Sequence, residues 1–585
     1  MRVLSGLRPY LWRNRRDLAL GLLFSVAVYA VALLGPWLLR LAIDGLSQPG
    51  GTDMWTLGRY ALLMAGAAAL ANVFSFLQHW RLFLVGNRVE FDYRNDFFRH
   101  LQEMEPAFFQ QRKTGDIVSL ATNDLGVIRT LVGAGSINFL NSTVALITGL
   151  SLMFVLDAKL ALYTLLILPL ITVVYVALAR PNRQRFERMQ EQYSVLSSMV
   201  QENIAGVRVV KAYAQEDAEL GKFGLLCQEY TRRAKSYMRL SGVLSPLMFV
   251  IFGFAVMVML LVGGDDVIHH RLTLGGLIQF NGYLMMLNWP VVALGWLITI
   301  VGQAEGAMNR LLSVQNRAAT IADGPATLPI GQVNGAVRFE DVSLTLNGTA
   351  ILRNISLDVP AGSSVAIVGA IGSGKSSLIN LILRLFDPTE GRVTLDGVDL
   401  RHVPLETLRR GVGYVPQETF LFSATLAENI LYGVEQSEPA RAEALVAQAS
   451  GLAGLAKDVA GFPEGYQTML GERGITLSGG QKQRAAIARA VAKDPRILIL
   501  DDALSAVDTQ TEDLILSGLR GVMEQRTSII VSHRISTVRH ADRIVVLSEG
   551  RIVESGTHRG LIAQGGLYAD MYRRQLLAEE MEETV

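Results

Sequence analysis

The chain has 585 residues, of which 50% are hydrophobic and only 18% are charged, against about 25% in typical soluble proteins. The long uncharged runs crowd the first half of the chain, whereas the second half reads as an ordinary globular domain. The formal net charge of +1 provides no field to attract a nucleic acid. The single cysteine, Cys227, excludes an intrachain disulfide and a multi-cysteine metal site.

The N-terminus is rich in arginine and is followed by a long apolar stretch. This stretch exceeds the 7–15 residues or so of a signal-peptide core, and Trp37, Leu38 and Leu39 do not form a small-residue cleavage site. We therefore interpret it as a first membrane span. The arginines are Arg2, Arg8, Arg13, Arg15 and Arg16.

Six segments in the first half are long and apolar enough to cross a bilayer as helices of about 20 residues. The connections after the first, third and fifth are short and poor in lysine and arginine, whereas those after the second and fourth are long and basic. The positive-inside rule places the long connections and both termini in the cytoplasm. The expected spans are 18–43, 57–80, 131–156, 159–179, 243–263 and 275–301.

The two long connections have helical periodicity, so we expect two pairs of membrane helices to continue into the cytoplasm as levers. At each tip a short segment, Phe108–Asp116 or Val209–Gln215, is a candidate to dock onto another domain; the alternative is a solvated loop. Polar residues within the spans either pack helices together or line a substrate path. They include Asn72, Asn138, Asn141, Gln279, Asn281, Asn288 and Gln303.

From about residue 335 the pattern changes to that of an α/β domain, so we expect a membrane domain at 1–310, a linker at 311–334 and a second domain at 335–585. A predicted strand, Ser364–Val368, runs into a phosphate-binding loop followed by a helical pattern. Its glycines let backbone N–H groups wrap phosphates. The loop is Gly369-Ala370-Ile371-Gly372-Ser373-Gly374-Lys375-Ser376-Ser377, with Lys375 expected on the β- and γ-phosphates and Ser376 on Mg²⁺.

A second buried strand, Ile497–Leu500, ends in Asp501 and Asp502. A carboxylate at the tip of a parallel strand is suited to binding magnesium beside the phosphate loop. We therefore predict that Asp501 is a Mg²⁺ ligand and that the domain binds ATP.

Between these two motifs lies Ser478-Gly479-Gly480-Gln481, followed by an alanine-rich helix. This segment resembles the signature motif of the ABC transporter ATPases. With six spans in front, the whole chain resembles a bacterial ABC exporter half-transporter of the multidrug and lipid type. The resemblance implies a type IV exporter-like membrane domain of six helices, followed by an α/β P-loop NTPase domain with a helical subdomain.

The family pattern also assigns individual residues. Gln417 matches the Q-loop residue that contacts Mg²⁺ and the membrane-domain tips, and Asp508 matches the D-loop. His533 matches the switch histidine that contacts the γ-phosphate. Segment 471–474 resembles the exporter segment before the signature, and 206–212 resembles the second coupling helix.

Two positions depart from the family pattern. Asp502 stands where the family usually has the glutamate that polarises the attacking water, and aspartate is one methylene shorter, by about 1 Å. A misplacement of that size can lower the rate about 100-fold. Leu346 stands where an aromatic residue usually stacks on adenine. The expected catalytic residues are Asp502, His533 and Gln417, with Leu346, the phosphate loop, Ser478–Gln481 and Asp508 contacting nucleotide.

In this family two nucleotide domains meet head to tail, and each ATP lies between one phosphate loop and the opposite signature. The resemblance therefore implies a second half-transporter subunit, the lipid bilayer and a hydrophobic drug, lipid or peptide substrate as partners. Aspartate at 502 is typical of the degenerate subunit of a heterodimer. The alternatives are a homodimer in which Asp502 suffices and an ATP-gated regulator or channel. A soluble ABC ATPase is disfavoured by the spans, and an importer by the fused exporter order.

Overall fold

The computed structural model of the chain describes residues 2–47, 52–166, 168–323, 333–346, 348–435, 438–471, 474, 477–505 and 509–583. It divides into two compact units. The helical unit comprises 1–102 and 113–317, and the sheet unit comprises 103–112 and 318–585. The expected fold class, a helical membrane domain followed by a P-loop NTPase-like domain, is confirmed by this architecture and by the comparisons below.

The helical unit consists of long helices, five of which are long and apolar enough to cross a membrane among the residues described. They are Arg15–Leu46, Met54–Glu103, Thr114–Leu156, Phe249–Ile268 and Leu274–Gln315. The expected span 159–179 lies on α9 and the start of α10 and includes Ile167, which is outside the described residues. The helices are α1 (Arg2–Arg13), α2 (Arg15–Ala32), α3 (Leu34–Leu46), α4 (Met54–Glu103), α6 (Thr114–Ser119), α7 (Leu125–Thr130), α8 (Ser136–Leu156), α9 (Ala158–Leu165), α10 (Leu168–Ala205), α11 (Val207–Ala212), α12 (Glu216–Ile268), α13 (Leu274–Met286) and α14 (Asn288–Gln315).

Two π-helical turns, η1 (Leu120–Asp124) and η2 (Leu131–Gly135), interrupt the rod from α6 to α8 without breaking it. Asp124 in the first turn forms a bidentate ion pair with Arg310 of α14, at 2.8 and 2.6 Å. At the second turn Gly133 lies close to Gly86 of α4, where a Cβ would be 3.2 Å from the Gly133 Cα. Both turns are therefore fixed by neighbouring helices.

Several polar residues within the spans join helices. The Asn141 amide oxygen accepts hydrogen bonds from Ser25 of α2, at 2.8 Å, and from Gln78 of α4, at 2.7 Å. Gln279 accepts from Arg40 at 3.2 Å, and Arg40 also pairs with Asp44 as its i,i+4 spacing predicts. These contacts favour helix packing over substrate contact as the role of Asn141 and Gln279.

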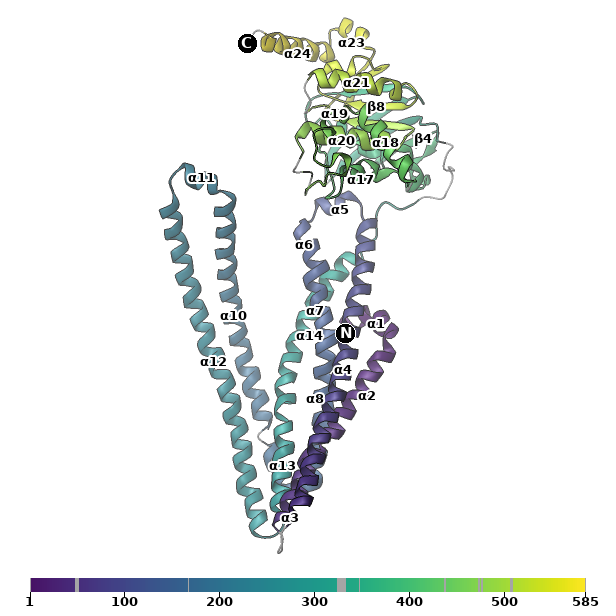
Figure 1. Cartoon of the computed structure of the whole chain (residues 1–585). Coiled ribbons are helices and arrows are strands. Elements are labelled where there is room, and N and C mark those ends of the chain that lie inside the picture. The colour runs from purple at the N-terminus through teal and green to yellow at the C-terminus, as the bar shows by residue number, and fades with distance from the viewer. Residues whose placement is uncertain are drawn as a thin grey trace. The chain divides into compact units, whose positions relative to one another are not determined.

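Helices α10 and α12 lie side by side as a hairpin joined through the short helix α11 (Figure 1). Within the helical unit the hairpin diverges from the other helices towards α11 (Figure 1). None of the six residues of α11 is buried, and Val209 is 61% exposed. The adjacent Tyr213 is 73% exposed. The second predicted tip therefore presents apolar side chains that its own unit does not cover.

The sheet unit is built on a six-stranded sheet of order β10-β9-β3-β8-β7-β6, in which β9, β3, β8, β7 and β6 are parallel. A second, antiparallel sheet has the order β2-β1-β4-β5. The strands are β1 (Val337–Leu346), β2 (Thr349–Val359), β3 (Ser364–Val368), β4 (Glu390–Leu395), β5 (Val398–Asp399), β6 (Val412–Val415), β7 (Ile497–Asp501), β8 (Thr527–Val531), β9 (Arg543–Ser548) and β10 (Arg551–Gly556).

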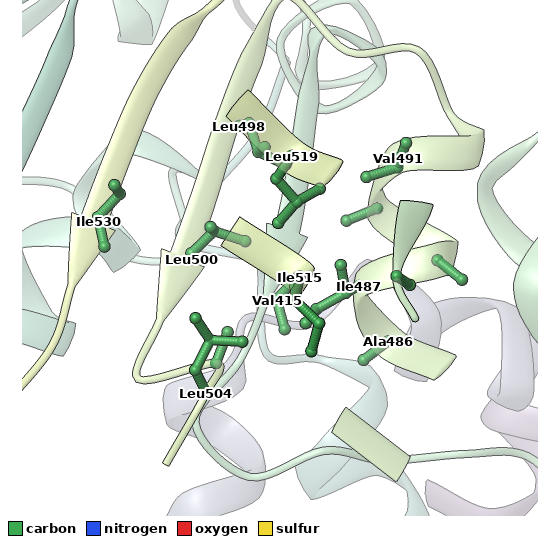
Figure 2. Packing of buried hydrophobic residues seen from close by; sticks show 14 of the residues in the cluster. Val415, Ala486, Ile487, Val491, Leu498, Leu500, Leu504, Ile515, Leu519 and Ile530 are labelled. Atoms are coloured by element: carbon green, nitrogen blue, oxygen red, sulfur yellow. The ribbon is translucent and has the colours of Figure 1, made fainter. Parts of the chain in front are cut away.

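Both faces of the large sheet are buried, because alternate residues of each strand belong to different hydrophobic cores. Ile497 and Ile499 of β7 join the core shared with the antiparallel sheet. Leu498 and Leu500 pack instead with Ile487 and Leu519 of the covering helices (Figure 2). This explains why the parallel strands read as continuous apolar runs.

The helices of the sheet unit connect these strands and cover them. They are α5 (Pro106–Gln110), α15 (Lys375–Ile382), α16 (Leu405–Gly411), α17 (Leu426–Ile430), α18 (Pro439–Leu452), α19 (Ala456–Val459), α20 (Gly479–Ala492), α21 (Thr509–Met523), α22 (Ile535–Val538), α23 (His558–Gln564) and α24 (Leu567–Glu583), with 3₁₀ turns η3 (Leu400–His402), η4 (Leu431–Gly433) and η5 (Gly465–Gln467).

Candidate nucleotide-binding site

The predicted phosphate loop connects β3 to α15, as expected. All three of its glycines have backbone angles that other residues rarely adopt, with φ of +156° at Gly369, +80° at Gly372 and +102° at Gly374. A Cβ at Gly369 would lie 2.1 Å from the Leu547 carbonyl oxygen. Glycine is therefore favoured at all three places for the loop to curl tightly.

Lys375 is the first residue of α15 and is only 7% exposed. Its Nζ donates to the carbonyl oxygens of Gly369, at 3.0 Å, and Ala370, at 2.8 Å. Burial lowers the pKa of this ammonium, while Asp501 and Asp502 act in the opposite direction. The cation is thus held inside its own loop, where a phosphate would offer it stronger, charged acceptors.

The loop also contains an unsatisfied donor. The Ser373 hydroxyl is buried and has no hydrogen-bond partner. A buried polar group without a partner is costly. Together with the wrapped backbone and Lys375, it fits a loop shaped for phosphate oxygens. Ser377 follows within α15, and Ile371 at the tip of the loop is 92% exposed.

Two of the three expected magnesium ligands, Ser376 and Asp501, lie next to each other. The Ser376 hydroxyl donates to Asp501 Oδ1 at 3.4 Å, although 125 residues separate them. Asp501 is 2% exposed, and burial raises the pKa of its carboxyl. A hydroxyl beside a carboxylate suits Mg²⁺, which is usually held by one or two protein groups together with substrate phosphates. Among the described residues no group of three or more His, Cys, Asp and Glu side chains is placed to hold a metal ion.

The remaining predicted groups follow the neighbouring strands of the same sheet. Gln417 comes after β6, Asp501 ends β7 and Asp502 follows it. His533 comes after β8, which lies beside β3 and the phosphate loop. Since the carboxyl ends of parallel strands meet at one edge, all these groups share that edge. Gln417 and His533 are exposed there.

Asp502 has the left-handed φ of +50°, and its N–H donates to the Val531 carbonyl oxygen at 2.8 Å. This contact fixes the backbone, so the reach of the side chain decides where its carboxylate lies. Asp502 and His533 both act on the charge of Asp501, Asp502 raising its pKa and His533 lowering it. Two of the three expected catalytic groups are therefore close enough to the expected magnesium ligand to affect its charge.

The signature Ser478–Gln481 lies at the start of α20 and is not at this edge of strand ends. The Ser478 hydroxyl accepts from the Gln481 N–H at 3.3 Å, and the Gln481 Oε1 accepts from the Ser478 N–H at 3.0 Å. Ser478 and Gly479 are exposed, and Gly480 is half-buried. Among the described residues no hydrogen bond joins the signature to the phosphate loop. The loop and the signature of one chain are thus separate features.

Three other expectations are placed only in part. Asp508 lies outside the described residues, as do Glu472 and Arg473 of segment 471–474. Leu346 ends β1 and is half-buried against the core of the antiparallel sheet. Its contact with adenine therefore stays a prediction.

Sequence reasoning missed Glu512 on α21, a carboxylate that is only 1% exposed. It accepts hydrogen bonds from Arg534 Nη1, at 2.5 Å, from Ser536 Oγ, at 3.3 Å, and from the Thr537 hydroxyl. Arg534 directly follows His533 and also donates to the Ser505 carbonyl oxygen at 3.5 Å. Through Arg534, Glu512 therefore holds the segment around His533 against Ser505, where the D-loop begins. The sequence indicated only an acidic residue early in the helix after Asp508, which does not predict this role.

Residues 108–112 of the first predicted tip, Phe108–Asp116, belong to the sheet unit, whereas 113–116 belong to the helical unit. Phe108 of α5 is fully buried, and the Arg112 guanidinium lies 4.9 Å from its ring centroid. Glu105, just before α5, accepts from the Thr320 N–H at 3.3 Å. This segment thus packs as part of the unit that carries the phosphate loop.

The fold and this site define a P-loop nucleotide-binding domain fused behind membrane-spanning helices. Residues 18–291 match the ABC transporter transmembrane region, and residues 352–505 match the ABC transporter domain. A probable multidrug resistance ABC transporter ATP-binding/permease protein of Bacillus subtilis strain 168, YheI, is 34% identical, with 96% of each chain covered. The uncharacterized ABC transporter ATP-binding protein YknU of the same strain is 35% identical, with 98% of each covered.

Among solved structures, a bacterial Atm1-family ABC exporter with ATP bound matches with a TM-score of 0.82 and 30% identity, over 96% of this chain and 99% of that one. The chain belongs to the ABC transporter family, as a half-transporter of the exporter type with its ATPase domain fused behind its membrane domain. It is a multi-pass membrane protein whose ATPase is coupled to transport.

Proposed function

We propose that this chain is one half of a heterodimeric exporter that moves a hydrophobic or amphipathic drug, lipid or peptide out across the cytoplasmic membrane, with both of its own termini in the cytoplasm. Its own ATP site binds nucleotide firmly and hydrolyses it slowly. The observation that carries this proposal is Asp502, which directly follows β7. Its backbone N–H is held by the carbonyl oxygen of Val531. A shorter side chain on a fixed backbone leaves its carboxylate about 1 Å short of the water that a glutamate would reach.

The second half of each ATP site comes from another chain. Ser478 and Gly479 are exposed, and the start of α20 offers N–H groups to a phosphate. In the dimer this signature faces the partner's phosphate loop, where a glutamate stands in place of Asp502. This chain thereby completes the partner's ATP site, where hydrolysis is fast. Asp508 belongs to the interface between the two nucleotide-binding domains.

The two predicted cytoplasmic tips support a dimer of this kind. Phe108 is covered inside the sheet unit, whereas Val209 and Tyr213 at α11 are exposed. Beside α11, an apolar groove of about 400 Å³ lies between the arms of the hairpin and is lined by Ile204, Val207 and Leu220, among others. We assign this second tip to the partner's nucleotide-binding domain. Each nucleotide domain then moves helices of both chains.

The residues at the strand ends have distinct roles in this proposal. Lys375 and the loop N–H groups hold the phosphates, and Ser376, Asp501 and Gln417 hold Mg²⁺, which neutralises phosphate charge when bound. Asp502 orients the attacking water weakly, and His533 contacts the γ-phosphate. Closure of the domain pair around nucleotide is favoured because only the closed pair completes these contacts. This differential affinity for the closed state turns the membrane cavity towards the outside.

The test of the degenerate site is steady-state ATPase of the purified chain, alone and with its co-purifying partner. The chain alone should turn over slowly, and Asp502→Glu should raise its rate about 100-fold when the partner signature is supplied. Asp502→Asn is the matched control and should not raise it. Robust turnover of the wild-type chain alone would establish a homodimer in which Asp502 suffices.

Transport is tested with the dimer in inverted vesicles, following a fluorescent hydrophobic dye and a labelled phospholipid. We expect ATP-dependent movement that non-hydrolysable ATP does not sustain. Movement sustained by non-hydrolysable ATP would instead establish an ATP-gated channel on the same scaffold. The resistance named for the relative YheI makes drugs the first class of substrate to assay.

A further inference from the structure

The N-terminal helix α1 has two unlike faces. Leu7 and Tyr10 are buried, at 1% and 6% exposed. The Tyr10 hydroxyl donates to Asp96 of α4 at 2.9 Å, and its ring lies 5.2 Å from that of Tyr93. A Cβ at Gly6 would lie 3.1 Å from the sulfur of Met308 on α14. One face of α1 is therefore fixed against the membrane helices.

We use the name arginine face for four arginines around Trp12: Arg8, on the side of α1 opposite Leu7 and Tyr10; Arg13, whose guanidinium lies 5.8 Å from the centroid of the Tyr10 ring; and Arg15 and Arg16 at the start of α2. All four arginines are exposed, and Trp12 is 66% exposed. The chain turns at Asn14, whose side chain donates to the Tyr10 carbonyl oxygen at 3.0 Å. The turn brings the Arg15 guanidinium to 5.0 Å from the centroid of the Trp12 ring. The Arg15 guanidinium and the indole thus form one compact surface at the junction of the two helices.

The charge of this surface is not neutralised by the protein. Within the described chain, none of the four arginines has a carboxylate at ion-pair distance. The nearest acidic residue in sequence, Asp17, is engaged by Arg81 and Arg88, each at 2.9 Å. Arg15 and Arg16 also open α2, where the helix dipole disfavours cations. An anion bound here would neutralise the unpaired arginines and offset the unfavourable interaction of Arg15 and Arg16 with the helix dipole.

The position of the surface indicates which anion. Arg15 begins the first membrane-spanning helix, so the arginine face lies where that helix leaves the bilayer. Tryptophan favours the headgroup level of a membrane, and arginine binds phosphate oxygens through paired N–H groups. We propose that the arginine face binds the phosphate headgroup of an anionic phospholipid of the cytoplasmic leaflet. This holds whether the chain pairs with itself or with a different subunit.

Native mass spectrometry of the detergent-purified full chain tests this assignment, with dioctanoyl-phosphatidylglycerol as the probe and dioctanoyl-phosphatidylcholine as the neutral counterpart. We expect phosphatidylglycerol to bind in preference. Replacing the four arginines by glutamine (R8Q/R13Q/R15Q/R16Q) should weaken its binding by about fivefold per arginine removed. The corresponding lysine variant should keep most of the affinity, because it keeps the charge. Trp12→Ala should weaken binding less than the quadruple glutamine variant does.

The matched control removes four exposed arginines that have carboxylate partners: R99Q/R183Q/R232Q/R338Q. It makes the same change in net charge and should bind phosphatidylglycerol as the wild type does. If the quadruple N-terminal variant does not fold, as judged by its ATP affinity, Arg8→Gln and Arg15→Gln are compared singly. Equal binding by the wild type and the N-terminal variants would overturn the proposal. So would equal affinity for phosphatidylcholine, or displacement of the lipid by millimolar inorganic phosphate.

Discussion

In this family each nucleotide lies between the phosphate loop of one chain and the signature of the other, and the two regions are built in opposite ways. The phosphate loop has a buried base, turns through glycines with left-handed backbone angles and closes around the cation of Lys375. The signature is an exposed helix start whose side chains satisfy their own backbone through the reciprocal bonds of Ser478 and Gln481. The first is shaped for a ligand before it binds, whereas the second is complete without one.

This difference indicates that the ATP affinity of the single chain and the closure of the two nucleotide-binding domains depend on different regions. A buried, charged loop accounts for nucleotide binding by a single chain. An exposed, self-satisfied helix start adds contacts only when a second protein surface brings a phosphate to it. Variants of the two regions should therefore affect different measurements.

The largest effect is expected for Lys375→Ala. Removing a buried, hydrogen-bonded cation from the phosphate contacts should lower the ATP affinity of the purified chain by about 30-fold or more. Binding of a fluorescent ATP analogue measures it. Lys482→Ala, just after the signature, is the matched control and should leave the affinity of the single chain unchanged. If Lys375→Ala bound ATP as tightly as the wild type, the phosphate loop would not be the region that determines the ATP affinity of the single chain.

Glu512→Gln tests whether the buried brace behind His533 positions the switch segment. Glutamine keeps the shape but removes the charge that holds Arg534, so the domain should lose about 1.5–3 kcal/mol of unfolding free energy. The kcat of the dimer should fall about tenfold, since small misplacements of reacting groups are costly, while the KM for ATP changes little. The exposed neighbour Asp513→Asn should alter neither kcat nor KM. A change in KM alone would contradict a positioning role.

Ser478→Ala should reduce the unfolding free energy of the domain by about 1 kcal/mol, because it removes the cap of α20. Thr425→Ala removes an equivalent reciprocal cap from α17 and is the matched control for stability. Both should leave ATP affinity of the single chain intact. Only Ser478→Ala should lower the ATPase rate of the dimer; equal rates for both variants would argue against a role across the interface.

The smallest effect concerns pH and magnesium. Because burial raises the pKa of the Asp501 carboxyl above its usual value, protons compete with Mg²⁺ at this ligand up to a higher pH than at an exposed aspartate. Magnesium affinity should therefore weaken as the pH is lowered through the raised pKa and be restored above it. Magnesium titrations of ATP binding at several pH values measure this effect, and Asp501→Asn should abolish the pH dependence. Chelation of magnesium should stop hydrolysis in all dimers.

The sequence predicted those parts of the site whose geometry is local. The glycines, Lys375 and Ser376 are contiguous between a strand and a helix, and Asp501 ends an apolar run, so spacing alone placed them. Glu512 escaped prediction because its role rests on contacts with a segment more than twenty residues away, and a buried carboxylate early in a helix looks like any other acidic residue.

The membrane half shows the same limit on what local sequence can predict. Charge patterning indicated two cytoplasmic tips, but composition did not distinguish Phe108, which is covered, from Tyr213, which is exposed. That distinction depends on which unit each tip packs with. Likewise, Asn141 was equally compatible with packing and substrate contact until its partners Ser25 and Gln78 were known.

The π turns at Leu120–Asp124 and Leu131–Gly135 have a consequence for how this rod changes over evolutionary time. Each turn accommodates one surplus residue in an otherwise regular spiral, so deleting one residue there restores ordinary winding without severing the rod. Because the wider turn absorbs the surplus residue, side chains beyond the deletion would keep facing the same way as before. Homologous chains one residue shorter at either place should therefore present the same stripe of this helix to its neighbours and keep the same fold.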